Sequence, residues 1–131
     1  MQPSLDLIGI VVTDMPRALA FYRALGLPIP PEADADPHVD VELSGGLRVA
    51  FDTVEVIRSF DPTYERPPAG RSGFVPAFLC GSPAGVDALY EELTAAGHTG
   101  HKEPWDAFWG QRYAEVLDPD GNLIDLFAPL A

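Results

Sequence analysis

Two carboxylates near the C-terminal end carry the chemistry that this sequence offers most clearly. Glu115 and Asp125 each stand in an alternating run, at positions opposite to the apolar residues that would face a core. Carboxylates that cluster beside apolar surface repel one another, and their pKa values rise unless a cation neutralises them. Such a pair suits a cationic ligand. It equally suits proton transfer, with Asp125 or Glu115 as the general acid or base.

Aromatic side chains gather in the preceding segment, 101–113, which reads HKEPWDAFWGQRY and contains both tryptophans of the chain. The aromatic residues of this segment are Trp105, Phe108, Trp109 and Tyr113. Aromatic faces can stack on a planar ligand or hold a cation. An alternative function for Trp109 is to fill the core or a subunit interface.

The elements that must position these groups follow from the hydrophobic pattern. Alternating or β-branched runs predict strands at 5–12, 38–43, 47–52, 74–80, 98–103, 111–117 and 122–127. Amphipathic runs that begin beside a proline and end before a glycine predict two helices, one capped by Thr13 or Asp14 and ending at Leu25, the other at 84–96. A short helix is expected near 54–60. The predicted class is α+β.

The chain also nearly repeats itself. Residues 7–25 (LIGIVVTDMPRALAFYRAL) return in pattern at 75–93 (VPAFLCGSPAGVDALYEEL), and 46–51 is matched by 121–126. This repeat predicts two βαβββ modules in tandem, 5–52 and 74–128, joined by a linker at 53–73. Two such modules make a curved sheet with a cleft.

Strand parity then assigns side chains to the cleft. Those that parity directs there as expected ligand contacts are Arg48, Asp52, Tyr113, Glu115, Asp125 and Phe127. Trp105 and Trp109 are added to the expected ligand contacts because of their aromatic faces. The side chains interpreted as solvated loop or edge groups are His38, Asp40, Glu42 and His101.

The opening LDLIGIVVTDMPRALAFYRALGL and the closing DPDGNLIDLFAP resemble the vicinal oxygen chelate superfamily. That superfamily includes glyoxalase I, extradiol dioxygenases, fosfomycin-modifying enzymes and bleomycin-resistance proteins. The resemblance extends over residues 1–131 as one domain. It implies the glyoxalase/bleomycin resistance fold, an incomplete barrel around a central cleft, and a homodimer. In the metal enzymes of this superfamily, His, Gln or Glu side chains from both modules hold a divalent ion.

The metal-ligand positions that the resemblance assigns are Leu7, Ala50, Val75 and Asp125. Three of these side chains have no metal-binding atom, and one carboxylate alone cannot hold a catalytic divalent ion. A register error of one residue is the remaining alternative, because it would turn each strand to its other face. The residues therefore predict a protein without a metal or another cofactor.

The composition of the chain disfavours some classes of binding partner. The net charge of −12 disfavours nucleic acid, whose phosphates would be repelled. No apolar run is long enough to span a bilayer, and the N-terminus lacks a signal-like core. The single cysteine, Cys80, excludes an internal disulfide and suits a reducing cytoplasm.

Three functions remain open from the sequence. The first is a metal-free protein that binds and sequesters an aromatic or cationic small molecule, like the drug-binding resistance members of the superfamily. The second is a lyase, isomerase or dioxygenase-type enzyme that uses Asp125 or Glu115 as acid or base, or an atypical metal site. The third, a metal-dependent glyoxalase-like lyase or dioxygenase, is disfavoured by the missing ligands.

Overall fold

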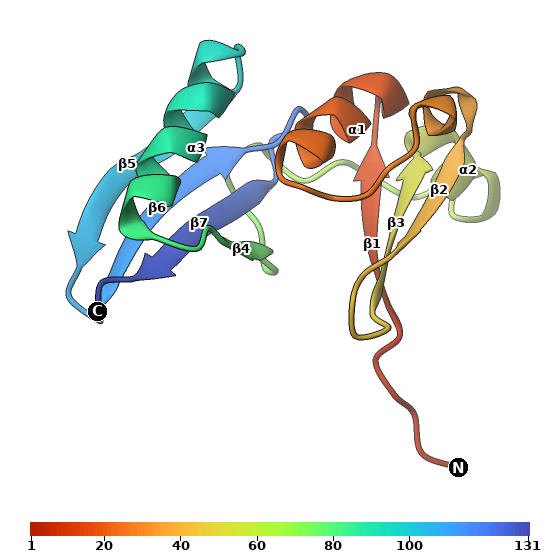
Figure 1. Cartoon of the computed structure of the whole chain (residues 1–131). Coiled ribbons are helices and arrows are strands. Elements are labelled where there is room, and N and C mark those ends of the chain that lie inside the picture. The colour runs from red at the N-terminus through yellow and green to blue at the C-terminus, as the bar shows by residue number, and fades with distance from the viewer. The chain divides into compact units, whose positions relative to one another are not determined.

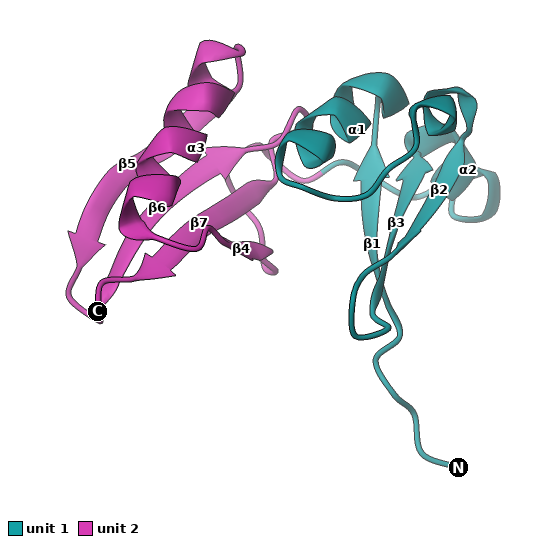
Figure 2. Ribbon diagram, in the orientation of Figure 1, with its two compact units in different colours: residues 1–66 teal, residues 67–131 magenta.

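The computed structural model describes all 131 residues. The chain divides into two compact units, Met1–Arg66 (unit 1) and Pro67–Ala131 (unit 2), which Figure 2 colours separately. Each unit contains one β-sheet and at least one helix, so the α+β class is confirmed (Figure 1). None of the helices combines the length and the apolar character that a membrane span requires.

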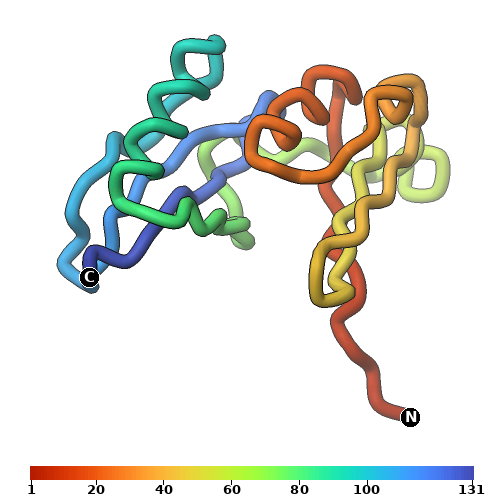
Figure 3. Tube along the Cα trace, in the orientation of Figure 1, coloured from red at the N-terminus to blue at the C-terminus, as the bar shows by residue number.

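Unit 1 contains a three-stranded sheet in the order β1-β3-β2. Its strands are β1 (Leu7–Val12), β2 (His38–Glu42) and β3 (Arg48–Thr53). Its helices are α1 (Met15–Ala24), the 3-10 helix η1 (Pro31–Ala35) and α2 (Val54–Phe60). The central strand β3 runs parallel to β1 and antiparallel to β2. The chain passes from β2 to β3 through a tight turn at 44–46, which can be followed in Figure 3.

Helix α1 forms where the sequence predicts it. The Asp14 carboxylate caps the helix by accepting a hydrogen bond from the backbone nitrogen of Arg17 at 3.1 Å, which satisfies one free amide of the first turn. Its apolar stripe packs on the sheet, where the Tyr22 ring lies 5.1 Å from the ring of Phe51. Both rings are almost fully buried. This contact fixes which face of β3 is covered.

Unit 2 contains a four-stranded sheet in the order β4-β7-β6-β5. Its elements are β4 (Ala77–Leu79), α3 (Pro83–Ala95), β5 (Thr99–Ala107), β6 (Gln111–Leu117) and β7 (Leu123–Pro129). Strand β4 is parallel to β7, and the other pairs are antiparallel. Helix α3 lies against β5, β6 and β7 and covers one face of the sheet (Figure 1). The sheet residues buried on that side are Ala114, Val116, Ile124, Leu126 and Ala128.

The structure corrects the predicted strands in three places. Unit 1 has the three strands predicted for it in the order βαββ, one strand short of the βαβββ module that the repeat predicts, and the stretch 28–37 contains η1. Four prolines in that stretch lack the amide hydrogen that a strand would need. Strand β4 is shorter than the predicted 74–80. Strand β5 extends to Ala107, and it accommodates Pro104 because it is the edge of its sheet.

The internal repeat is confirmed in the strand register. Gly9 pairs with Ala50 in unit 1, and Ala77 pairs with Asp125 in unit 2. Ala50 in turn pairs with Asp40, as Asp125 pairs with Glu115. Strands β1, β2 and β3 therefore correspond to β4, β6 and β7. Strand β5 has no counterpart in unit 1.

Candidate functional site

The predicted site residues of unit 2 meet on the face of the sheet opposite to α3, here called the open face. Strands β6 and β7 alternate strictly, so the residues between the buried ones point away from the helix. Glu115 pairs across the strands with Asp125, and Tyr113 pairs with Phe127. All four side chains are partly exposed. The structure thus brings together the two carboxylates and two of the predicted ligand contacts.

One phenol lies close to both carboxylates. The Tyr113 hydroxyl donates a hydrogen bond to Glu115 Oε2 at 3.4 Å. Burial raises the pKa of Asp125 to about 6; the Tyr113 hydrogen bond opposes this rise, and the neighbouring Glu115 adds to it. Burial, and next the hydrogen bond to Asp125, also raise the pKa of Tyr113. Asp125 Oδ1 is buried and has no hydrogen-bond partner.

An aromatic cluster lies beside the carboxylates, with Trp109 at its centre. The Trp109 ring packs edge to face on Trp105 at 5.5 Å, on Phe108 at 4.9 Å and on Tyr113 at 5.2 Å between ring centroids. Trp109 remains 48% exposed and donates a hydrogen bond from Nε1 to Gln111 Oε1 at 2.8 Å. Trp109 therefore does not fill the core of unit 2. The indole Nε1 of Trp105 is buried without a hydrogen-bond partner.

Lys102 belongs to this site, although the sequence did not reveal it. Lys102 pairs with Glu115 across β5 and β6, and its ammonium lies 5.0 Å from the centroid of the Trp105 ring. Lys102 and Trp105 share a face despite their odd spacing, because the register of β5 shifts between them. Strand parity alone could not assign Lys102 to the same face as Trp105. The signal in the sequence was a positive charge three residues before this tryptophan, within reach of its ring.

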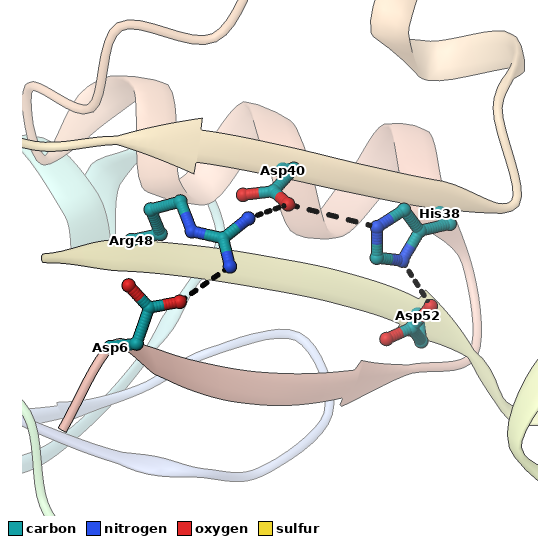
Figure 4. Close-up of polar contacts among 5 residues, drawn as sticks. All are labelled: Asp6, His38, Asp40, Arg48 and Asp52. Carbon is teal, nitrogen blue, oxygen red and sulfur yellow. Dashed lines mark hydrogen bonds and ion pairs between the residues drawn. The ribbon is translucent and has the colours of Figure 1, made fainter. Parts of the chain in front are cut away.

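Arg48 and Asp52 lie in unit 1, where other residues of that unit engage them (Figure 4). The Arg48 guanidinium donates to Asp40 Oδ2 at 2.7 Å and to Asp6 Oδ2 at 2.6 Å. The Asp52 carboxylate contacts His38 Nδ1 at 2.5 Å. Asp40 and His38, interpreted from the sequence as solvated edge groups, are therefore partners in an ion-pair network on the exposed edge strand β2 and its neighbours.

The side chains at the superfamily's metal-ligand positions do not fit a metal ion. Asp125 is the only one of the four with a donor atom, and Ala50 is 2% exposed, enclosed on the central strand β3. Val75 precedes β4, and the residue that pairs with Asp125 is Ala77, which offers no ligand either. No group of three or more His, Cys, Asp or Glu side chains is arranged to hold a metal ion.

A metal titration tests this reading. Added Ni²⁺, Zn²⁺, Mn²⁺ or Fe²⁺ is expected to leave the melting temperature of the protein unchanged, because only ligand that binds the folded state raises it. The measurement is a thermal unfolding scan with and without each ion, on protein purified without chelator. About one bound equivalent of a divalent ion, together with a melting temperature that EDTA lowers, would contradict the expectation.

The raised pKa of Asp125 predicts a pH-dependent stability. The folded state holds this proton more tightly than the unfolded chain, so the contribution is complete below pH 4 and is lost as the pH rises through 6. Asp125→Asn should remove this loss of stability between pH 4 and pH 7. Relative to the wild type, the unfolding free energy of the variant should therefore be about 1–2 kcal/mol more favourable at pH 7 than at pH 4, a figure reduced to allow for the partial exposure of Asp125. Urea unfolding at both pH values measures it. Equal pH dependences for the wild type and the variant would contradict the prediction.

Comparison with known proteins agrees with this architecture. The model of the Glyoxalase/Bleomycin resistance protein/Dioxygenase superfamily matches residues 4–126. Among solved structures, a glyoxalase/bleomycin resistance protein/dioxygenase family enzyme from Burkholderia phytofirmans PsJN is similar with a TM-score of 0.79 and 21% identity, over 98% of this chain and 100% of that one. A glyoxalase/bleomycin resistance protein/dioxygenase from Nocardioides gives a TM-score of 0.73 and 26% identity, over 99% of this chain and 85% of that one.

A glyoxalase-related enzyme from Fulvimarina pelagi gives a TM-score of 0.78 and 19% identity, over 97% of this chain and 88% of that one. The comparison with curated proteins gives no match. The solved structures that are under 25% identical to this chain show that it shares their fold. Membership of the superfamily follows from the family model, which matches nearly the whole sequence. This chain belongs to the glyoxalase/bleomycin resistance protein/dioxygenase superfamily.

Proposed function

We propose that this protein binds an aromatic, positively charged small molecule on the open face of unit 2, without a metal ion. The observation that carries the proposal is the pair Glu115 and Asp125 beside the aromatic cluster around Trp109. The carboxylates supply negative charge, and the rings supply flat apolar surface. Cations bind to aromatic faces, and carboxylates strengthen that binding when water is partly excluded.

The net charge of −12 supports a cationic ligand for a second reason. A strongly negative protein concentrates small cations near its surface and repels anions. Buried Asp125 Oδ1 supports the same choice, because an unpartnered carboxylate oxygen is satisfied by a donor that carries positive charge. Sequestration of such a molecule is the cellular role that we assign.

Three probes that share one ring test the proposal. Benzamidinium is a planar cation, benzamide is its neutral relative and benzoate is an anion of the same size. Both tryptophans of the chain lie in the cluster, so intrinsic fluorescence reports on this site directly. Benzamidinium is expected to change the emission in a saturable way, benzamide more weakly and benzoate not at all. Equal responses to all three probes, or none, would refute the proposal.

A second candidate function is metal-free acid–base catalysis, as in a lyase or an isomerase. It is favoured by the pKa of Asp125 near 6 beside a second carboxylate, because one group can then donate a proton while the other accepts one. Binding alone predicts that a ligand protects the protein against thermal unfolding and is recovered unchanged. Catalysis predicts a chemically altered compound, which mass spectrometry of the ligand after incubation would detect.

A further inference from the structure

A row of apolar side chains, here called the apolar row, crosses the open face of unit 2 from one edge of the sheet to the other. Leu79 of β4 pairs with Phe127 of β7, and Phe127 pairs with Tyr113 of β6. Tyr113 in turn pairs with Trp105 of β5. Paired residues of neighbouring strands project on the same side of a sheet. The four side chains therefore form one continuous row, to which each strand contributes one residue.

The apolar row is open to solvent at its β4 end. Leu79 is 66% exposed, although it is a large apolar side chain, and Phe127 and Tyr113 beside it are partly exposed. At the β5 end the Lys102 ammonium lies 5.0 Å from the centroid of the Trp105 ring, so a cation already occupies that end. The open part spans three strands, or about 10 Å, because neighbouring strands lie about 4.8 Å apart. That length exceeds one six-membered ring.

A second row runs beside the apolar row and contains the negative charges. Asp125 pairs with Glu115 on one side and with Ala77 of β4 on the other. The two rows are separated by two residues along each strand, which corresponds to about 7 Å. Ala77 is exposed, and its methyl group is too short to cover Leu79 beside it. The carboxylates thus follow one side of an apolar surface that stays uncovered.

We infer that the ligand of the open face is an elongated aromatic cation with at least two rings, which lies across β4, β7 and β6 on the apolar row. The inference rests on the proposed function; it adds the size and orientation of the ligand and makes Leu79 a contact residue. Charge complementarity selects this occupant, because Asp125 and Glu115 attract a cationic group at the side of the row. Lys102 repels that group from the β5 end, so it lies toward β7.

Two amidinium probes that differ by one ring test the length of the site. Benzamidinium has a single ring, and biphenyl-4-carboxamidinium has a second ring in line with the first. In calorimetric titrations at pH 7.5, the longer probe is expected to bind about tenfold more tightly, because its second ring buries further apolar surface. Leu79→Ala should reduce this ratio to about twofold. Leu5→Ala, the same replacement at an exposed leucine of unit 1, should preserve the tenfold ratio.

The outcomes separate this inference from the proposed function. If neither probe binds, the proposed function fails and the inference fails with it. Equal dissociation constants for the two probes, or a ratio that Leu79→Ala does not change, would overturn the inference and leave the proposed function standing. The competing occupant of the apolar row is a second copy of the chain, which sedimentation velocity tests. A dimer that Leu79→Ala dissociates would overturn the inference, whereas equal sedimentation of the wild type and the variant supports it.

Discussion

Removal of both carboxylate charges, by Glu115→Gln together with Asp125→Asn, is expected to weaken benzamidinium binding by about 100-fold, which corresponds to about 2.7 kcal/mol. The two groups lie side by side on β6 and β7, and they are the negative groups that the aromatic cluster flanks. The replacements preserve size, and they remove the charge together with one acceptor oxygen of each carboxylate. Fluorescence titration at pH 7.5 measures the loss.

The matched control for this variant removes a carboxylate from α3, the helix that covers the other face of the same sheet. Glu91→Gln changes an exposed residue of α3 and should alter the dissociation constant less than about twofold, because screened charges at a distance contribute little. Retained affinity in the double variant would show that the carboxylates do not hold the cation. Thermal unfolding of both variants confirms that each is folded.

Gly121→Ala is expected to destabilise unit 2 by about 2–4 kcal/mol, the sum of left-handed backbone strain and a steric clash. Gly121 has a φ of +85°, and an added Cβ would lie 2.6 Å from the Cβ and 2.8 Å from the Cα of Ala69. The segment at Ala69 cannot retreat freely, because the Gly70 amide donates a hydrogen bond to the Gly121 carbonyl at 2.8 Å. Urea unfolding measures the change.

Gly110→Ala separates the two causes. Gly110 has a φ of +93°, but nothing lies within 4 Å of the Cβ that alanine would add. This variant should therefore cost only the backbone strain, about 1 kcal/mol. Equal losses at Gly110 and Gly121 would mean that the Ala69 segment does not pack against the turn as described.

The sequence was sufficient to predict an element where its hydrophobic pattern and its flanking turn residues agreed. Strand β6 has the predicted bounds because strict alternation runs between Gly110 and the turn that follows Leu117. The pairing of Glu115 with Asp125 could be anticipated because both lie five residues from Asp120 in a single antiparallel hairpin. The structure also adds the hydrogen bond from the Tyr113 hydroxyl to Glu115, which strand parity alone does not specify.

Other features depend on contacts between strands, which the hydrophobic pattern of the sequence does not specify. The register shifts of β5 break the two-residue period, so the shared face of Lys102 and Trp105 was hidden. The strand predicted at 98–103 continues to Ala107 as β5, so Trp105 lies within a strand that the pattern ends too early. His38 and Asp52 lie at equal distances from Gly45, and that symmetry could have predicted their contact.

The matching registers of the two units have an evolutionary consequence. A duplicated sheet places Asp40 and Glu115 at corresponding points, yet the position beside them holds Ala50 in one copy and Asp125 in the other. In the first copy Asp40 forms an ion pair with Arg48, and Asp52 contacts the His38 ring across the strands. In the second, a carboxylate oxygen stays unmatched. The two matching sheets therefore differ in one respect: Asp40 of unit 1 is paired within its own unit, whereas Asp125 of unit 2 keeps an unpartnered carboxylate oxygen.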